Sequence, residues 1–182
     1  MRQVGRGELD LEAPIAELSP EWRGRDRERV TVRQLLDHSA GLPAHARLFE
    51  SLAGAVAYET AIAALPLDHA PGQAAVYSDV GFMLLGFILA RTGGAPLDHQ
   101  FGGIVGAMAT DAGGDALGFT PAEGLRPRIA PTEVDAWRGR LVVGEVHDEN
   151  AAALGGVAGH AGLFGTAAAV GAFARLVLDT FH

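Results

Sequence analysis

The feature that most limits the possible folds is an unbroken apolar segment of eleven residues, 80–90, near the middle of the chain. Ser78 or Asp79 can cap a helix at its start, and Gly93-Gly94 can end it. This helix is apolar nearly all round and therefore has to be buried by other elements. It is also well short of the about 20 residues that cross a bilayer, so we expect no membrane span. Its expected apolar stripe consists of Phe82, Leu85 and Leu89, flanked by Met83 and Phe87.

Further helical patterns lie on both sides of this segment. Thr31-Val32-Arg33-Gln34 has the form of a capping box and predicts a short helix that stops before Gly41. Residues 53–65 are rich in Ala and predict a second helix. Thr166 is the expected cap of a last helix, whose apolar residues are Val170, Phe173, Leu176 and Val177.

Strand patterns are scarce. Within the irregular stretch 130–150, residues 139–143 are the only plausible strand, and residues 102–118 are too rich in Gly and Ala to carry a pattern. The sequence therefore predicts a chain that is mainly α.

The basic residues exclude several mechanisms, because all 14 are Arg and the chain contains no Lys. Walker-type phosphate loops, Schiff-base enzymes and serine enzymes that use lysine as the base all require that amine. The chain has no Cys either, which excludes thiolate nucleophiles, disulfides and cysteine metal clusters. We expect no cofactor.

The net charge of −8 arises from the region after residue 33, since residues 1–33 hold seven Arg and seven acidic residues. A nucleic acid is therefore not an expected partner. Asp26 and Glu28 interrupt the Arg-rich stretch 23–29, which predicts a solvated loop. Residues 1–10 are too charged for a signal peptide, and the sequence leaves both the compartment and the oligomeric state open.

A serine nucleophile is the first catalytic possibility, but none of the four serines lies in Gly-x-Ser-x-Gly or in Ser-x-x-Lys. Asp37-His38-Ser39 contains the three residue types of a catalytic triad. Neighbours in sequence cannot relay a proton through one another, so we interpret these residues as a helix end and a turn.

A metal site is the second possibility, with His147-Asp148-Glu149 and His160 as candidate ligands. Their spacing matches no known zinc helix, and hydrogen-bonded loop anchors are the favoured interpretation. The Gly-rich stretch 155–162 lacks the lysine of a phosphate loop, which favours tight turns or close backbone approach.

Several stretches together resemble the serine β-lactamase-related hydrolases, which include class C β-lactamases, low-molecular-weight penicillin-binding proteins and family VIII esterases. Residues 30–43, VTVRQLLDHSAGLP, are similar to the "H-T-S-G-L-P" segment of that family. Tyr77-Ser78-Asp79, with the apolar helix after it, resembles the Tyr-x-Asn element. Residues 129–133, 144–151 and 155–166 resemble a branch of penicillin-binding proteins and esterases.

The resemblance implies the helical lobe and adjoining loops of an α/β β-lactamase/transpeptidase-like fold. It implies Tyr77 and Asp79 as catalytic residues, with the phenol relaying protons, and a small-molecule or peptidoglycan-type substrate: a β-lactam, a D-alanyl peptide or an ester. Two positions depart from the family. Asp79 replaces an amide by an acceptor-only anion, and Ala169 stands where Asp often begins the last helix.

The family's nucleophile, the serine of Ser-x-x-Lys, is missing from the chain, as is its Lys-Thr-Gly or His-x-Gly strand. By the resemblance, the first would precede a segment like residues 4–14 and the second would follow His182. We therefore expect residues 1–182 to be the central part of such a domain. A phenol, whose ordinary pKa is about 10, is a poor base at neutral pH unless a cation lies beside it.

The expected function is thus a fragment of a β-lactamase-related hydrolase, inactive as it stands. Three alternatives stay open: a non-catalytic binding or regulatory module, a metal-binding protein that uses the His, Asp and Glu residues named above, and a truncated product that folds poorly.

Overall fold

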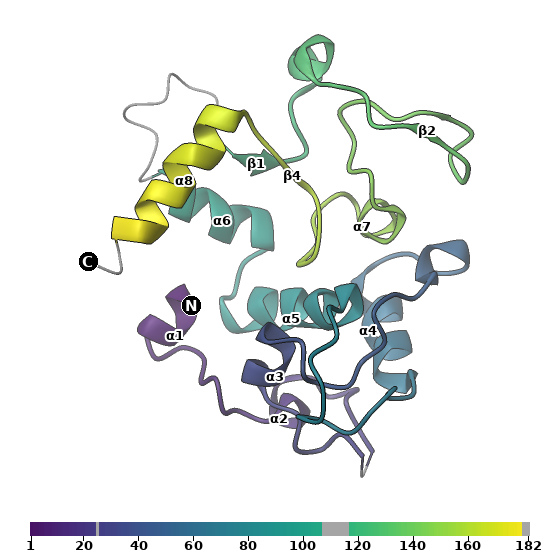
Figure 1. Cartoon of the computed structure of the whole chain (residues 1–182), viewed down its shortest axis with the longest axis vertical. Helices are drawn as coiled ribbons and strands as arrows, with labels where there is room; N and C mark the ends of the chain where they lie inside the picture. The colour runs from purple at the N-terminus through teal and green to yellow at the C-terminus, as the bar shows by residue number, and fades with distance from the viewer. Residues whose placement is uncertain (25, 107–116, 180–182) are drawn as a thin grey trace. The chain divides into compact units, whose positions relative to one another are not determined.

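A computed structural model of the chain describes residues 1–24, 26–106 and 117–179. These residues form two compact units (Figure 1). The first unit comprises Met1–Ala95 with Ala158–His160, and the second comprises Pro96–Val157 with Ala161–His182. Among the described residues, no single helix is both long and apolar enough to cross a membrane. The sequence predicted no structure for residues 102–118, and most of that stretch, residues 107–116, lies outside the described residues.

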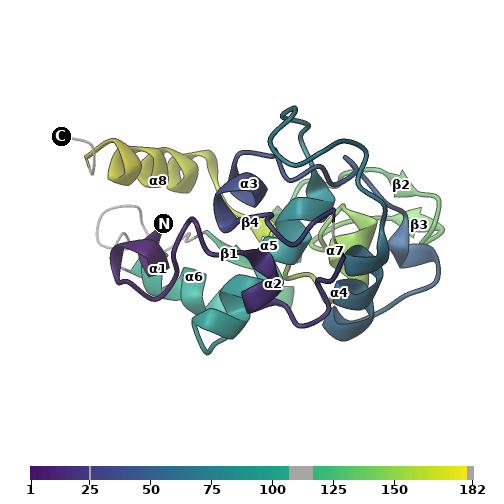
Figure 2. The ribbon, with the colours of Figure 1, turned by 90° about the horizontal axis from the view of Figure 1, so that it is seen from below.

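The first unit is helical. Its elements are α1 (Arg2–Gly5), α2 (Ile15–Leu18), α3 (Val32–Leu36), the 3-10 helix η1 (Leu48–Glu50), α4 (Ala55–Ala64) and α5 (Asp79–Thr92). The long helix α5 packs against α3 and α4, which lie beside it in both views (Figures 1 and 2). The mainly helical prediction is confirmed for this unit.

Helix α5 is buried, as its composition predicted, but the buried face differs from the expected stripe. Phe82 and Leu89 are only half-buried. The reason is that another face of the helix points into the core. Val80, Leu84 and Ile88, which follow one another at intervals of one helical turn, are fully buried. The residues that α5 buries are Val80, Gly81, Met83, Leu84, Leu85, Gly86 and Ile88.

The predicted capping box at the start of α3 is confirmed. The Thr31 side chain accepts from the Gln34 N–H, while the Gln34 side chain accepts from the Thr31 N–H at 3.1 Å. Each partner satisfies a backbone donor that the first turn of a helix leaves without an intrahelical acceptor.

Residues 158–160 pack onto α5 although they are far away in sequence. A Cβ at Gly159 would overlap the carbonyl oxygen of Phe82 and would lie 3.0 Å from the backbone of Gly86. The predicted close backbone approach in the Gly-rich stretch is therefore confirmed at this position.

The expectation of a solvated Arg-rich loop is wrong for Arg27, whose side chain is 7% exposed. Its guanidinium donates to the carbonyl oxygens of Ala63 at 2.6 Å and Leu65 at 2.8 Å, and it lies over the buried ring of Trp22. These contacts replace the water that the cation loses on burial. At the surface, the hydrogen bond from Arg27 lowers the pKa of the Asp26 carboxyl.

The second unit contains short elements joined by loops. They are α6 (Leu97–Val105), β1 (Gly118–Phe119), the 3-10 helix η3 (Glu123–Arg128), β2 (Val134–Asp135), β3 (Arg140–Leu141), α7 (Glu149–Ala153), β4 (Leu163–Phe164) and α8 (Ala167–Asp179). β1 pairs with β4 and β2 with β3, both antiparallel. The strand predicted over 139–143 is the two-residue strand β3.

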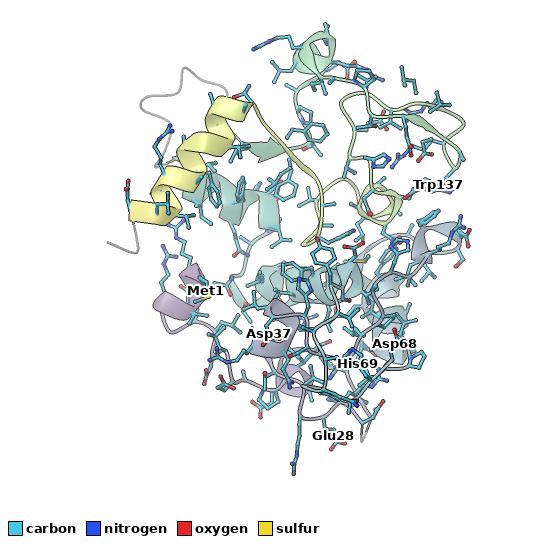
Figure 3. The ribbon with its side chains drawn as sticks, in the orientation of Figure 1. Met1, Glu28, Asp37, Asp68, His69 and Trp137 are labelled. Carbon is cyan, nitrogen blue, oxygen red and sulfur yellow. The ribbon has the colours of Figure 1, made fainter. Side chains whose placement is uncertain are left out.

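An ion pair holds the β2–β3 hairpin and the loop that follows it. Asp135 is 1% exposed, and its Oδ2 accepts from Arg138 Nη1 at 3.2 Å. Arg138 also donates to the carbonyl oxygens of Val146 and His147, each at 3.1 Å. Trp137, labelled in Figure 3, lies in the hairpin turn with the Arg138 guanidinium 5.4 Å from its ring centroid. We call Asp135, Arg138 and these carbonyls the hairpin clasp.

The last helix, α8, begins as predicted, since Thr166 Oγ1 accepts from the Ala169 N–H at 3.2 Å. Ala169 is buried. Of the predicted apolar stripe, Phe173 is half-buried, whereas Val170, Leu176 and Val177 are each at least 36% exposed.

Candidate functional site

The Tyr77-Ser78-Asp79 segment leads directly into α5, and Ser78 is the N-cap. Its Oγ accepts from the Gly81 N–H at 3.0 Å and donates to the carbonyl oxygen of Pro43 at 2.7 Å. Ser78 is 4% exposed. Its hydroxyl therefore ties the helix start to the 38–45 loop and is not presented as a nucleophile.

The 38–45 loop lies along this segment and holds it by its backbone. The Val76 N–H donates to the His38 carbonyl at 3.0 Å, and the Asp79 N–H donates to the Ala44 carbonyl at 2.9 Å. Between them, the Ser78 N–H donates to Nδ1 of His38 at 3.1 Å. The two stretches that carried most of the family resemblance thus form one structural element.

The loop can follow this path because of Gly41. Its φ is +86°, a backbone region that favours glycine, and a Cβ there would overlap the His69 carbonyl oxygen. The Gly41 carbonyl accepts from the Asp68 N–H at 2.9 Å, which joins the loop to the chain after α4.

The Tyr77 side chain is 71% exposed at this site. Its ring centroid lies 4.7 Å from that of His38 at an interplanar angle of 41°, and the His38 ring stacks on Phe82 at 4.8 Å. The phenol therefore rests on a stack of two rings and faces solvent, where a ligand can reach it.

Asp79, the second predicted site residue, lies in the first turn of α5, where a carboxylate interacts favourably with the helix dipole. Its side chain is 28% exposed, and Oδ2 is 3.6 Å from Nδ1 of His45. His45 is a site residue that the sequence analysis missed. Its only sequence signal was its position two residues after Pro43, in the loop that resembled the family.

As the sequence analysis predicted, no catalytic triad is formed by the Asp37-His38-Ser39 segment. Both the N–H and the Oγ of Ser39 donate to Asp37 Oδ1, at 3.0 Å and 2.6 Å. His38 is turned away toward Ser78. Asp37, labelled in Figure 3, is the C-cap of α3, which confirms the interpretation as a helix end and turn.

Two of the four candidate metal ligands, His147 and Asp148, have other partners. His147 Nε2 lies 2.8 Å from Glu133 Oε1, and Asp148 Oδ1 caps α7 by accepting from the Ala151 N–H at 2.7 Å. His160 belongs to the other unit. In the part of the chain that the structure describes, no three His, Asp or Glu side chains are grouped as metal ligands.

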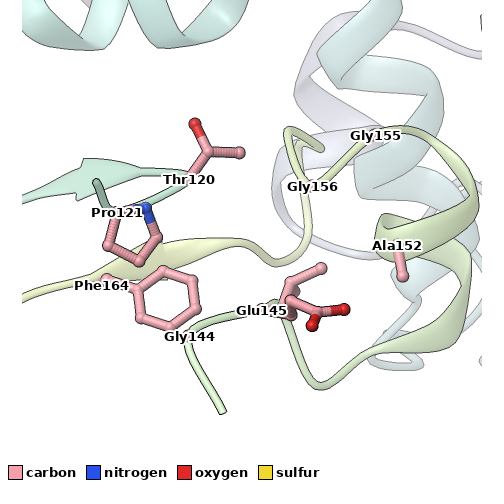
Figure 4. A pocket seen from close by; sticks show the side chains of 9 residues that line it. Thr120, Pro121, Gly144, Glu145, Ala152, Gly155, Gly156 and Phe164 are labelled. Carbon is pink, nitrogen blue, oxygen red and sulfur yellow. The ribbon is translucent and has the colours of Figure 1, made fainter. Parts of the chain in front are cut away.

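The second unit contains a pocket of about 300 Å³ (Figure 4). Its lining residues are Thr120, Pro121, Gly144, Glu145, Val146, Ala152, Gly155, Gly156 and Phe164. Arg140 donates to both carboxylate oxygens of Glu145, at 2.9 Å and 2.6 Å, and these bonds hold the pKa of Glu145 below its ordinary value. The lining carboxylate is therefore paired with a cation, and its lowered pKa makes it a weaker base than a free carboxylate.

The two tyrosines of the chain differ sharply in exposure, which provides a test of the site. Tyr58 is fully buried and Tyr77 is 71% exposed. We expect tetranitromethane to nitrate Tyr77 at least about tenfold faster than Tyr58, because Tyr58 reacts only when its surroundings open. Peptide mass spectrometry measures both rates. In denaturant both residues should react alike, and equal rates under native conditions would contradict the described packing.

Comparisons with known proteins show the family and the fold of the chain. A family model described as "Beta-lactamase" matches residues 1–181. A protein of Escherichia coli (strain K12) named "Putative D-alanyl-D-alanine carboxypeptidase" is 31% identical over 182 residues. The match covers 88% of this chain and 41% of that protein, so the chain spans less than half the length of this relative.

Solved structures show the same fold at lower identity. A penicillin binding protein from Bacillus halodurans matches with a TM-score of 0.72 at 18% identity, covering 98% of this chain and 55% of that one. A class C beta lactamase from Rhodobacter sphaeroides matches with a TM-score of 0.73 at 20% identity, covering 98% and 47%. These matches confirm the predicted fold class. The chain belongs to the beta-lactamase family and corresponds to part of the fold that its relatives contain.

Proposed function

We propose that the chain supplies the tyrosine-bearing part of a serine acyl-transfer hydrolase whose substrates are D-alanyl peptides or β-lactams. The observation that supports this most strongly is Tyr77. It is exposed on a preformed ring stack at the capped start of α5, in a chain whose family match covers residues 1–181. The names of the carboxypeptidase, penicillin-binding and class C relatives support this substrate class.

In this proposal a serine from a Ser-x-x-Lys segment attacks the carbonyl, and the Tyr77 hydroxyl passes a proton to the leaving group. The four serines of residues 1–182 include none in such a motif, and the chain contains no lysine. A phenol needs a neighbouring cation to act as a base at neutral pH. Residues 1–182 alone are therefore proposed to bring about no turnover.

The test has two arms. The 182-residue chain, incubated with a chromogenic cephalosporin, a D-alanyl-D-alanine peptide, a p-nitrophenyl ester and a fluorescent penicillin, should show neither hydrolysis nor a covalent adduct by mass spectrometry. In a version extended to the length of the relatives, Tyr77→Phe should lower kcat by about 10²–10⁴-fold. Val56→Ala, at a site 81% exposed on α4, is the control and should leave kcat unchanged.

Two results would contradict the proposal. An acylated serine in the 182-residue chain would show that it needs no further nucleophile. Full activity of Tyr77→Phe in the extended protein would remove the phenol from the mechanism.

A second candidate, a non-catalytic binding module, is favoured by the combination of an exposed phenol with the Asp79–His45 pair and no lysine. Saturable binding of a D-alanyl-D-alanine peptide to the 182-residue chain, weakened by Tyr77→Phe and without turnover in the extended protein, would support this function over the first.

A further inference from the structure

We propose that His38 is a positioning residue for Tyr77: through Nδ1 it holds the backbone that carries the phenol, and through its ring it supports the phenol itself. The proposal rests on the proposed function for its catalytic consequence. The geometry on which it depends is independent of that function.

The hydrogen bond to Ser78 determines which nitrogen of the neutral imidazole carries the proton. The donor is the Ser78 backbone N–H, so Nδ1 of His38 has to accept and cannot carry a proton. The neutral ring therefore carries its proton on Nε2. In this form Nδ1 gives the Ser78 N–H a partner one residue after Tyr77, at the N-cap of α5.

The same ring lies between two aromatic side chains. Its centroid is 4.7 Å from that of Tyr77 and 4.8 Å from that of Phe82, with which it stacks at 23°. Because Phe82 is on the first turn of α5, the stack fixes the imidazole against the helix, and the phenol rests on the imidazole. A single side chain thus controls both the backbone and the ring of the site.

The neighbouring charged groups are engaged elsewhere. The Asp37 carboxylate accepts two hydrogen bonds from Ser39, and the Asp79 carboxylate lies 3.6 Å from His45. Neither interaction orients His38. Its orientation comes from the Ser78 N–H and from the ring stack, which distinguishes His38 from the histidine of an acid-base pair.

The backbone at His38 makes a matched pair of variants possible. Its φ is +61°, a left-handed conformation that Asn and Gly both adopt readily. His38→Asn keeps an acceptor two bonds from Cβ, where Nδ1 lies, whereas His38→Gly removes it. Neither variant introduces strain at this position, but Gly also gives the backbone more freedom. A difference between the variants at the Ser78 amide therefore reports the hydrogen bond when the Gly81 amide at the helix start does not share it.

Hydrogen exchange of the Ser78 amide in the 182-residue chain is the direct test. We expect exchange about tenfold faster in His38→Gly than in the wild type, and near the wild-type rate in His38→Asn. The amide of Gly81, which donates a hydrogen bond to Ser78 Oγ, is an internal control that reports opening of the helix start. Nitrogen NMR of the imidazole, assigned by the signals lost in His38→Asn, should show the proton of His38 on Nε2.

The ring contact is tested with 3-fluorotyrosine, which gives one fluorine signal for each of the two tyrosines. The Tyr77 signal should move in both variants, because both remove the imidazole, and the signal of buried Tyr58 should not move. In the extended protein, kcat should fall by about tenfold or more in His38→Gly and be partly restored in His38→Asn, with KM little changed.

Three results would overturn the proposal: a proton on Nδ1, equal exchange of the Ser78 amide in the Asn and Gly variants, or an unmoved Tyr77 fluorine signal. If the extended protein has no hydrolase activity at all, the proposed function fails, while the exchange and NMR measurements still decide the role of His38.

Discussion

Replacing Asp135 by Ala is expected to lower the free energy of unfolding by about 3–5 kcal/mol, because it leaves the buried Arg138 cation without its counter-charge. The Asp135 and Arg138 side chains are only 1% and 8% exposed. The carbonyls of Val146 and His147 would still accept from Arg138 but carry no charge to balance it. Loss of the hairpin clasp should therefore also release the loop that contributes Glu145 and Val146 to the pocket.

Urea unfolding followed by circular dichroism measures this loss. Glu123→Ala is the matched control, because Glu123 and Arg126 have the same i, i+3 spacing, but their side chains are 86% and 44% exposed. Such a surface pair is worth about 0–1 kcal/mol. Equal losses from Asp135→Ala and Glu123→Ala would show that the clasp is not a buried ion pair.

Replacing Trp22 by Ala is expected to cost about 3–5 kcal/mol, since it removes a fully buried aromatic side chain and leaves a cavity. The indole Nε1–H also donates to the Arg27 carbonyl at 2.9 Å, and the Arg27 guanidinium lies 5.1 Å from the ring centroid. Removing the ring exposes one side of a buried cation. The loss of unfolding free energy should therefore lie near the upper end of the range expected for truncating a buried side chain.

Thermal and urea unfolding followed by circular dichroism measures this effect. Trp22→Phe keeps most of the apolar volume but lacks the N–H donor, so its loss should be clearly smaller, about 1–2 kcal/mol. Val56→Ala, on the exposed side of α4, should change stability by no more than about 0.5 kcal/mol. A loss for Trp22→Ala within that range would contradict the described core.

Helix α5 shows how far local patterns predict this fold. Its apolar composition, its cap at Ser78 or Asp79 and its end at Gly93 could be predicted, because each signal involves residues within one turn of one another. The structure selects Ser78 as the cap. Its buried face was not, because an element apolar on every side has no periodicity that selects one. Only the placement of α3 and α4 decides that the 80, 84 and 88 row faces inward.

In the Arg-rich loop, by contrast, the local pattern led to a wrong prediction. Interspersed charges predicted exposure at Arg27, yet carbonyls of residues 63 and 65 draw its guanidinium into the core. Backbone carbonyls are strong acceptors, but every residue carries one. No pattern in the sequence can therefore identify which of them will meet a particular arginine.

At the candidate site, Tyr77 and Asp79 were predicted because their order and surroundings resemble a family, and the match over residues 1–181 confirms that family. His45 and the acceptor role of His38 could not. They depend on the 38–45 loop lying against residues 76–79, a contact across about 35–40 residues of chain. Asp135 and Arg138 are three residues apart, so a local pattern is enough to suggest that they pair. Their burial, however, depends on the loop at 146–148.

By itself the sequence determined the helical character of this chain, the caps of its main helices, the absence of lysine chemistry and the family to which its motifs belong. The tertiary structure decided which helix face is buried, which arginines enter the core and which histidine supports the phenol. The physical reason is that propensity, periodicity and capping act between residues a few positions apart. Burial and long-range hydrogen bonds depend instead on which distant segments the folded chain brings together.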